Sequence, residues 1–596
     1  MNEQYHALEQ HRIAIIGGGP AGLFAFKNLI ASPLTNYAVH IFEATDKLGM
    51  GMPYSKYGSG REHITNVSGN EIPELVTTVL HWVKNEAPES LLTQYHIDRQ
   101  TFHEFMVLPR LLFGEYLRHQ FQLLIEEAGK KNIDTRIFLN TSVTDIIDLP
   151  FSGYVIVECN HSYTAAYRSA IISTGHFWPV TEEEKVPGFF DSPYPPSKLE
   201  GLCNHPVAIR GSGLTAIDAI RTIARNNGRF EKEAEETIYI ANEDAPDFNI
   251  VLHTLRGLLP AVRFHLDDPQ LSAKSLLTPD EIACHIAEND GFLSLDFIFE
   301  KDYKEILKQK DPALYDTIRN MTMEEFVEKV MEMREQRDPF ELFAAEYREA
   351  QRSIEKERSV YWKELLAILS YEMNYPAKHF SAEDMLRLQK VLMPLISVVI
   401  AFVPQTSCEE LLALYKAGRL QMTIVDAESR VQAVETGGIH YHYVDEEGIS
   451  QKKYFASYVN CTGQAHLEKN DFPFKSLLES GSVSAATLPF RNSMSYPGEV
   501  ASAKNILTDI HGHHHLKVPG VRISDHFNLV DEKGIDNKRI YLMAVPYMGG
   551  YNPDYSGLDF CNHASELIVQ DMEENIIMNK AEAGTNIVKE GLESRA

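Results

Sequence analysis

The sequence has no Cys-x-x-Cys, no long apolar run and no excess of positive charge. Its six cysteines are distant from one another, which argues against a redox-active dithiol and against a zinc ribbon. The least polar window, residues 391–404, is shorter than the ~20 residues that a membrane-spanning helix needs. We therefore interpret this window as a buried core segment.

Acidic residues outnumber basic ones by 84 to 56, which gives a formal net charge of -28. Binding of nucleic acid or of an anionic membrane requires clustered Lys and Arg, so neither partner is expected. The Gly-x-Ser-x-Gly, His-Glu-x-x-His and P-loop motifs of hydrolases and NTPases are also absent. Because the N-terminus is polar and unlike a signal peptide, the widely spaced cysteines predict a cytoplasmic location.

What the sequence does contain is a glycine-rich turn close to its start. The apolar residues 13–16 are followed by three glycines in Gly-x-Gly-x-x-Gly spacing: Gly17, Gly19 and Gly22. The first permits a tight turn, the second lets backbone N–H groups approach a pyrophosphate, and the third lets helix and strand pack closely. A helix at 23–30 and a strand at 37–42 are predicted next, and Glu43 after the strand can accept hydrogen bonds from a ribose diol. This combination indicates a dinucleotide site.

A second turn follows the apolar residues 207–210, in the Gly-x-Gly-x-x-Ala variant of the same spacing. Its residues are Gly211, Ser212, Gly213, Leu214 and Thr215. The strand expected beside it, 249–253, ends without an acid, and Arg256 follows. A guanidinium can pair with a 2′-phosphate that an acid would repel, so we predict NADPH here and FAD at the first turn. The alternative is that 237–241 is the neighbouring strand and Arg256 is an ordinary surface arginine.

The two turns resemble those of the two-dinucleotide flavoproteins, most closely the bacterial FAD/NAD(P)-binding family related to flavin-containing and N-hydroxylating monooxygenases. Further stretches carry this resemblance: 49–55 (GMGMPYS), 63–67 (HITNV), Pro109-Arg110 with 114–117, 412–420, the strands 170–175 and 458–463 that end in Thr-Gly, and 539–543 followed by Gly549-Gly550 and a helix from 558. The Phe-x-Gly-x-x-x-His fingerprint of the flavin-containing monooxygenases is absent.

The resemblance implies an α/β fold with two Rossmann-like dinucleotide-binding domains and a helical insertion. The expected domains are FAD-binding (1–200), NADPH-binding (201–263), helical insertion (264–400, with helices at 323–334 and 360–369), NADPH-binding again (401–455), FAD-binding again (456–578) and a polar, disordered tail (579–596). The insertion is expected to be a lid or substrate wall, or else a packing or dimerisation module.

The resemblance also implies which residues hold the cofactors. Those expected for FAD are Gly17, Gly19, Pro20, Ala21, Gly22, Glu43, Gly49, Met50, Gly51, Asn66, Val67, Arg110, Val143, Thr174, Gly175, Gly463 and Gly549. NADPH is expected at residues 211–215 and at Arg256, and Asn66 and Gln464 are the expected catalytic polar residues. No metal is expected, and we interpret the histidines at 511–515 as a solvated loop.

The implied function is that of an FAD-dependent, NADPH-consuming monooxygenase acting on a small nucleophile, with N-hydroxylation of an amine or amino acid favoured. In such enzymes NADPH reduces the flavin, and a flavin C4a-(hydro)peroxide transfers oxygen to the substrate. The expected partners are a small-molecule substrate and dioxygen, and a homo-oligomer is left open. Two alternatives remain: a flavin reductase or dehydrogenase that passes electrons to a quinone or a protein, and a non-catalytic FAD-binding regulator.

Overall fold

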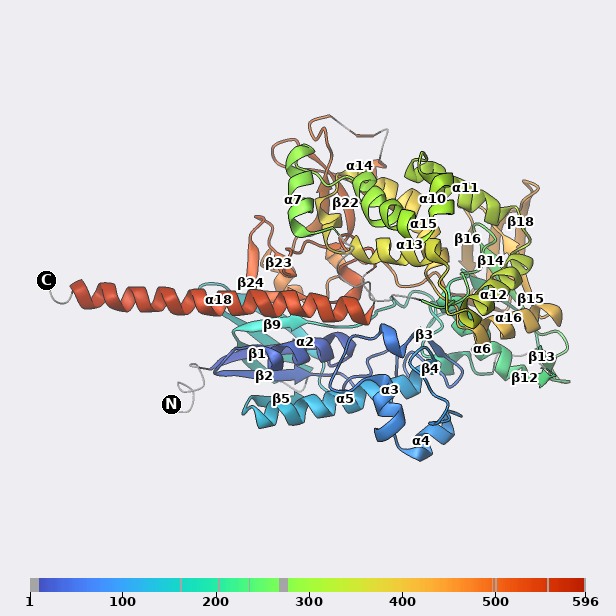
Figure 1. The fold of residues 1–596 in the computed structure, drawn as a ribbon, viewed down its shortest axis with the longest axis horizontal. Coiled ribbons are helices and arrows are strands. Elements are labelled where there is room, and N and C mark those ends of the chain that lie inside the picture. Colours follow the sequence, from blue (N-terminus) through green and yellow to red (C-terminus); the bar gives the residue numbers. More distant parts are fainter. Residues whose placement is uncertain are drawn as a thin grey trace.

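The computed structural model describes residues 10–160, 163–201, 204–234, 236–266, 277–495, 497–498, 501–554 and 557–593. Two parallel sheets lie in separate parts of the molecule, and a block of helices lies alongside both (Figure 1). The expected α/β fold with two dinucleotide-type sheets and a helical middle region is confirmed.

The first sheet has the strand order β23-β24-β9-β1-β2-β5 and is parallel except for β23. Its strands are β1 (His11–Ile16), β2 (Tyr37–Phe42), β5 (Asp134–Phe138), β9 (Ser169–Ile172), β23 (Asn528–Val530) and β24 (Asp536–Leu542). Strand β2 is buried along its whole length, as expected for a strand covered on both faces.

Helices and a small antiparallel sheet cover this first sheet. The helices are α2 (Pro20–Ala31), α5 (Arg110–Lys130) and α18 (Leu558–Glu593), and α2 contacts both of the others. The antiparallel strands are β6 (Val143–Leu149), β7 (Tyr154–Cys159) and β8 (Thr164–Tyr167), which contact β1, β9 and β24. Smaller elements of this domain are β3 (Ile64–Ser68), β4 (Val107–Pro109), α3 (Val79–His81), α4 (Glu89–Gln94), α17 (Lys475–Glu479), β20 (Ala485–Pro489), β21 (Ile506–Thr508) and β22 (His514–Val521).

The second sheet is parallel and has the strand order β10-β19-β11-β14-β15. Its strands are β10 (Phe189–Phe190), β11 (Pro206–Arg210), β14 (Asn249–Thr254), β15 (Leu420–Ile424) and β19 (Ser457–Asn460), with helices α6 (Leu214–Asn226) and α16 (Gln405–Lys416). The antiparallel strands β16 (Arg430–Ala433), β17 (Ile439–Val444) and β18 (Ser450–Phe455) pack aromatic residues against it.

The competing strand predicted at 237–241 does exist, but it does not join the second sheet. It is β13 (Glu236–Ala241), which pairs in an antiparallel hairpin with β12 (Gly228–Glu233). Strand β14 pairs with β11 from Asn249 to His253, so the strand that precedes Arg256 is the neighbour that we expected.

The helical insertion is confirmed as a run of short helices. They are α7 (Pro279–Glu288), α8 (Leu295–Ile298), α9 (Ile306–Lys310), α10 (Pro312–Ile318), α11 (Met323–Glu335), α12 (Pro339–Glu355), α13 (Tyr361–Glu372), α14 (Ala382–Arg387) and α15 (Met393–Val399). Capping boxes at Thr278 and Thr322 begin two of them, since each hydroxyl and a glutamate three residues later satisfy free N–H groups. Half of the apolar window 391–404 lies in α15, whose Leu395 and Val399 are buried as expected.

Three expectations about the chain differ from the structure. Strand β19, which we assigned to the returning FAD domain, is a strand of the second sheet. The polar tail expected from 579 continues as part of α18 up to Glu593 (Figure 1). The histidines at 511–515 are not all in a loop, because His514 and His515 begin β22.

The physical reason for the β19 difference is that both sheets use the same local pattern. In each, a short apolar strand flanks the central strand, and its end abuts the glycine turn: a Cβ on Gly17 would lie 2.5 Å from Ser173 O, and one on Gly211 would lie 2.6 Å from Cys461 O. A short apolar strand that ends beside a glycine turn therefore occurs once in each sheet. Only the strand pairing shows to which sheet each of the two strands belongs.

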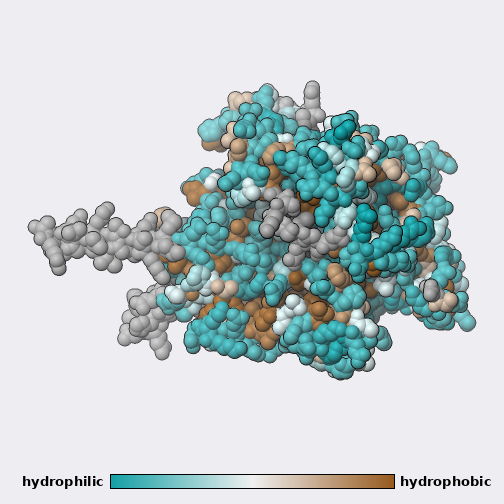
Figure 2. Space-filling model, in the orientation of Figure 1, coloured by the Kyte–Doolittle hydropathy of each residue, from teal (hydrophilic) through white to brown (hydrophobic). Residues whose placement is uncertain are grey.

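No helix in the described part of the chain is long and apolar enough to cross a membrane. Polar residues cover most of the face seen in Figure 2, and apolar residues are scattered between them.

Candidate functional site

The first glycine turn has the geometry that its sequence predicts. Gly17 has a φ of +107°, and its N–H donates to Phe42 O at 2.8 Å. A Cβ on Gly22 would lie 2.1 Å from Gly17 O, so only glycine lets α2 pack this closely on the turn. Two of the three glycines therefore have the backbone roles expected of them.

Glu43 is fixed at the end of β2 by hydrogen bonds to its neighbours. One carboxylate oxygen accepts from the Gly18 N–H at 2.9 Å. The other accepts from the Thr45 N–H and hydroxyl, both at 2.8 Å. The carboxylate is thereby held at the wall of the cavity beside the turn, where remaining lone pairs can accept from a diol.

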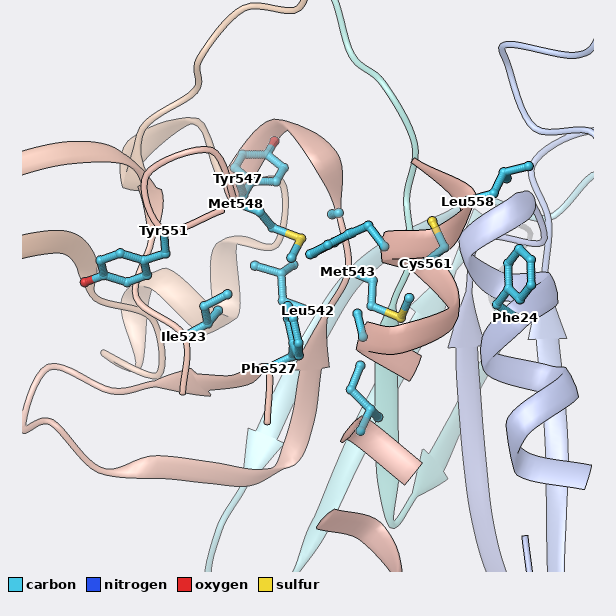
Figure 3. Packing of buried hydrophobic residues seen from close by; sticks show 14 of the residues in the cluster. Phe24, Ile523, Phe527, Leu542, Met543, Tyr547, Met548, Tyr551, Leu558 and Cys561 are labelled. Carbon is cyan, nitrogen blue, oxygen red and sulfur yellow. The ribbon is translucent and has the colours of Figure 1, made fainter. Parts of the chain in front are cut away.

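This cavity, called cavity A, has a volume of about 420 Å³ and runs along the glycine turn. Nine of the residues expected to hold FAD line it: Gly17, Gly19, Pro20, Ala21, Glu43, Gly51, Val143, Thr174 and Gly175. The end of β24 and the start of α18 also line it, through Met543, Leu558 and Cys561. Figure 3 shows these three residues, with Leu558 next to the helix that carries Phe24.

A second cavity, called cavity B, has a volume of about 390 Å³ and shares Tyr54 and Leu558 with cavity A. Asn66 and Val67 from β3 line it, and α13 of the insertion supplies Glu364 and Tyr371. The insertion therefore forms one wall of a cavity that adjoins the first dinucleotide turn.

Cavity B is acidic. Its described lining residues include no Lys or Arg but five carboxylates: Glu71, Glu364, Asp554, Asp559 and Glu566. Burial, with a further contribution from the Asp559 charge, raises the pKa of Asp554 to about 7. Burial also raises the pKa of Asp559. Glu71 is paired with Arg263, which lies outside this lining.

The two expected catalytic residues lie in different places. Asn66 lines cavity B, and its backbone carbonyl accepts a hydrogen bond from Arg263. Gln464 contacts the wall of cavity A instead, since its Oε1 lies 3.1 Å from His176 Nδ1. Burial lowers the pKa of His176, which favours the neutral ring. The structure does not bring Asn66 and Gln464 into one cluster.

Several other residues expected to bind FAD support the site from outside the lining of cavities A and B. Gly49 has a φ of +85° and donates its N–H to Gly18 O at 2.7 Å. Met50 is buried, and the Gly463 carbonyl accepts from Trp178 Nε1 at 3.2 Å. Gly549 lies after β24, and neither cavity includes it in its lining.

Arg110 joins the two dinucleotide-type domains. Its Nη1 lies 2.6 Å from Asp218 Oδ2 on α6, and Tyr194 donates to the same oxygen at 2.8 Å. The charge of Arg110 holds the pKa of Asp218 below its usual range despite burial. This residue, expected at FAD, is placed in a buried ion pair between α5 and α6.

The second turn repeats the geometry of the first. Gly211 also has a φ of +107°, and its N–H donates to His253 O at 2.9 Å. Gly213 is exposed, with no atom near the position of an added Cβ, so the N-terminus of α6 is open to a phosphate. Thr254 follows His253 at the position that corresponds to Glu43 after Phe42 in the first sheet.

The remaining residues expected at NADPH surround this opening. Leu214 and Thr215 form the first turn of α6, and Ser212 donates its hydroxyl to Leu258 O at 2.7 Å. Arg256 lies in the loop after β14, where its Nη1 is 2.8 Å from Glu335 Oε1 on α11 of the insertion.

Residues that the sequence reasoning missed include Tyr54, His176, Asp554 and Glu364. Tyr54 lies in the stretch 49–55 that carried the resemblance, and His176 directly follows Gly175, so a local signal existed for both. Asp554 and Glu364 had none, because they meet only when α13 and the segment before α18 pack together.

Comparison with known proteins supports the assignment of the first turn to a dinucleotide-binding domain. Residues 14–177 match the model of the FAD-NAD(P)-binding family, and residues 278–400 match that of the YdhS-like middle domain. The uncharacterized protein YdhS of Escherichia coli (strain K12) is 28% identical over 474 residues, which is 78% of this chain and 86% of that protein. The match to the YdhS-like middle domain coincides with the helical insertion.

Solved structures with a similar chain path include hydroxylases and reductases. The ornithine N-hydroxylase KtzI of Kutzneria sp. 744 is 14% identical, with 95% of this chain and 99% of that chain covered and a TM-score of 0.43. The ornithine hydroxylase PvdA of Pseudomonas aeruginosa is 12% identical, with coverages of 95% and 99% and a TM-score of 0.45. The thioredoxin reductase of T. acidophilum is 9% identical, with coverages of 95% and 100% and a TM-score of 0.35. Likenesses this weak carry no argument about function.

Residues 14–177 therefore form a domain that matches the FAD-NAD(P)-binding family, and a second parallel sheet follows it in the fold. The expected cofactor pair, FAD with a nicotinamide dinucleotide, agrees with the family description. The helical middle region of the chain is of the type found in YdhS-like proteins.

Proposed function

We propose that the protein is a flavin-dependent, NADPH-consuming monooxygenase that N-hydroxylates a small cationic amine. The observation that carries this proposal is cavity B, which adjoins the dinucleotide cavity and whose lining includes Asp554, Asp559 and Glu566 besides the Glu71 that Arg263 already pairs. A protonated amine would offset the charge of these groups, whereas an anionic substrate would be repelled.

The residues of cavity A fit FAD. The glycine turn opens backbone N–H groups at the start of α2, and Glu43 is held where a ribose can donate to it. When bound, FAD supplies the hydride-accepting and dioxygen-activating chemistry. The protein positions the cofactor and the substrate, and α13 contributes one wall of cavity B.

Asp554 is suited to proton transfer in this cavity. An amine must lose a proton before its nitrogen can act as a nucleophile, and a carboxylate with a pKa of about 7 can accept that proton near neutral pH. The Asp554 backbone is fixed by Asn374, whose Oδ1 accepts from the Asp554 N–H at 2.6 Å. This contact ties the position of Asp554 to the insertion.

The test uses the FAD-loaded full chain and a panel of diamines and basic amino acids, each paired with an analogue in which a hydroxyl replaces the amine. We expect amine-stimulated, oxygen-dependent NADPH oxidation with one added oxygen in the product. Asp554→Asn should lower kcat/KM for the amine about tenfold or more, because the proton acceptor is lost, and leave KM for NADPH unchanged. Glu574→Gln, an exposed position on α18 outside the cavity, is the matched control.

Two results would contradict the proposal. Equal stimulation by the uncharged analogues would contradict the selection of a cation, and formation of peroxide alone across the panel would show that no amine is oxygenated. Anaerobic turnover with an artificial electron acceptor, without an oxygenated product, would instead identify the flavin reductase alternative. A bound flavin that NADPH cannot reduce would identify the non-catalytic alternative.

A further inference from the structure

We infer that Glu335 of the helical insertion competes with the 2′-phosphate of NADPH for Arg256 and thereby sets the dinucleotide selectivity of the second turn. The inference rests on the proposed function, because it takes the second turn to be the site of the nicotinamide dinucleotide. It assigns a specificity role to a residue far from the glycine motif in sequence.

The first step is that the second turn lacks its own acid. Both sheets align the central strand and its neighbour in the same way, with Ile16 opposite Phe42 and Arg210 opposite His253. The next residue is Glu43 in the first sheet and Thr254 in the second. The Thr254 hydroxyl accepts from the Gly257 N–H at 3.0 Å and so shapes the loop that carries Arg256.

The second step is that this loop lies directly beside the turn. Ser212, inside the glycine motif, donates its hydroxyl to Leu258 O at 2.7 Å. Arg256 is two residues before Leu258, and its side chain is 49% exposed, so a ligand seated on the turn can reach it. The chain thus presents a guanidinium near the ribose end of the expected site.

The third step is that the insertion supplies the missing acid. Glu335, the last residue of α11, places Oε1 2.8 Å from Arg256 Nη1. The start of α12 lies close to this loop, since a Cβ added at Gly257 would lie 3.7 Å from Pro339 Cγ. The corner between α11 and α12 is therefore packed where a 2′-phosphate would approach Arg256.

The two anions exclude one another at this position. A 2′-phosphate that pairs with Arg256 must replace the Glu335 carboxylate or bind against its negative charge. NAD lacks this phosphate, so its binding does not compete with Glu335 for Arg256. Because the pair is exposed, the effect on affinity is a factor of about three to ten and not an all-or-none block.

The experiment measures dissociation constants of NADP⁺ and NAD⁺ by titration calorimetry on the FAD-loaded full chain. We expect Glu335→Gln to tighten NADP⁺ about three- to tenfold and to change NAD⁺ by less than about twofold. Arg256→Gln should weaken NADP⁺ about tenfold or more. In the double variant, Glu335→Gln should have no further effect, because it acts through Arg256.

The matched control is Glu328→Gln, which removes the same charge from an exposed position two turns earlier on α11. Equal effects of the two glutamate variants, or a Glu335→Gln effect that persists without Arg256, would overturn the inference. If the wild-type protein holds FAD and binds neither dinucleotide, the proposed function fails as well. If NADP⁺ binds tightly and with the same affinity to the wild-type and Glu335→Gln proteins, the inference is contradicted and the proposed function is not.

Discussion

A single buried histidine makes the second domain sensitive to acid. His253 is 1% exposed, and its ring is stacked on Tyr441 with the centroids 4.0 Å apart. Burial lowers the pKa of His253 from 6.5 to about 4. The unfolded chain therefore takes up a proton at a higher pH than the folded one. The stability contributed by the neutral ring is complete above pH 6.5 and is lost as the pH falls from 6.5 towards 4.

We predict that His253→Phe, which keeps the stacked ring and removes the titration, lowers this sensitivity. Between about pH 7.5 and pH 5.5, the wild-type protein should lose about 1 kcal/mol more of its unfolding free energy than the variant. Urea unfolding at the two pH values measures the difference. His40, whose pKa is also lowered to about 4, is present in both proteins and cancels. Parallel losses in the two proteins would show that His253 does not titrate as described.

At the scale of elements, the two dinucleotide turns differ in how closely their helices pack. Gly22 brings α2 against the backbone of the first turn, whereas the second turn has the buried Ala216 at the same spacing. The methyl group of Ala216 is accommodated beside α6, so this turn does not require the same close approach. We therefore expect the first turn to be much less tolerant of substitution.

Gly22→Ala tests this difference, because its new Cβ would lie 2.1 Å from Gly17 O and must displace α2. We predict that the flavin occupancy of the variant falls about tenfold. The ratio of flavin absorbance to protein absorbance measures it. The control is Gly129→Ala on α5, where nothing lies within 4 Å of the new Cβ. It should retain flavin and gain up to about 1 kcal/mol of stability. Full flavin content in both variants would contradict the packing argument.

The contact between α5 and α6 rests on a buried charge pair. The side chains of Arg110 and Asp218 are 14% and 6% exposed. Asp218→Asn leaves the Arg110 charge without its partner, so we predict a loss of about 3–5 kcal/mol in unfolding free energy. Tyr194→Phe removes only one hydrogen bond to the pair and should cost about 1 kcal/mol. Denaturant unfolding distinguishes the two, and similar small losses would mean that the pair is not desolvated as the structure indicates.

The elements that the sequence predicts well are those whose signal is local. The range of β2 and the turn at Gly17 follow from an apolar run and a glycine spacing, and both are confirmed. The sheet to which β19 belongs depends on pairing between residues 250 positions apart, which no local pattern encodes. For the same reason cavity B was not foreseen. Glu364 and Asp554 line one cavity only because the insertion packs against the segment before α18.

At the scale of the whole molecule, the insertion contacts both parts of the expected electron path. Its helix α13 forms a wall of cavity B, and its helix α11 pairs with the loop beside the second turn. One helical block therefore adjoins the expected substrate cavity and the expected NADPH site. A lid or substrate wall, which was one of the two roles expected for the insertion, remains the role that we favour.

The net charge of -28 and the acidic cavity B lead to opposite salt effects for the two ligands of the proposed reaction. Attraction speeds the encounter with a dicationic amine, and repulsion slows the encounter with anionic NADPH. Screening over about 10 Å at 0.1 M salt weakens both. We predict that kcat/KM for a diamine falls several-fold between about 20 and 300 mM NaCl, while kcat/KM for NADPH stays level or rises. Steady-state kinetics with each ligand varied in turn measures this. A parallel fall for both ligands would indicate general inhibition by salt and would contradict the electrostatic argument.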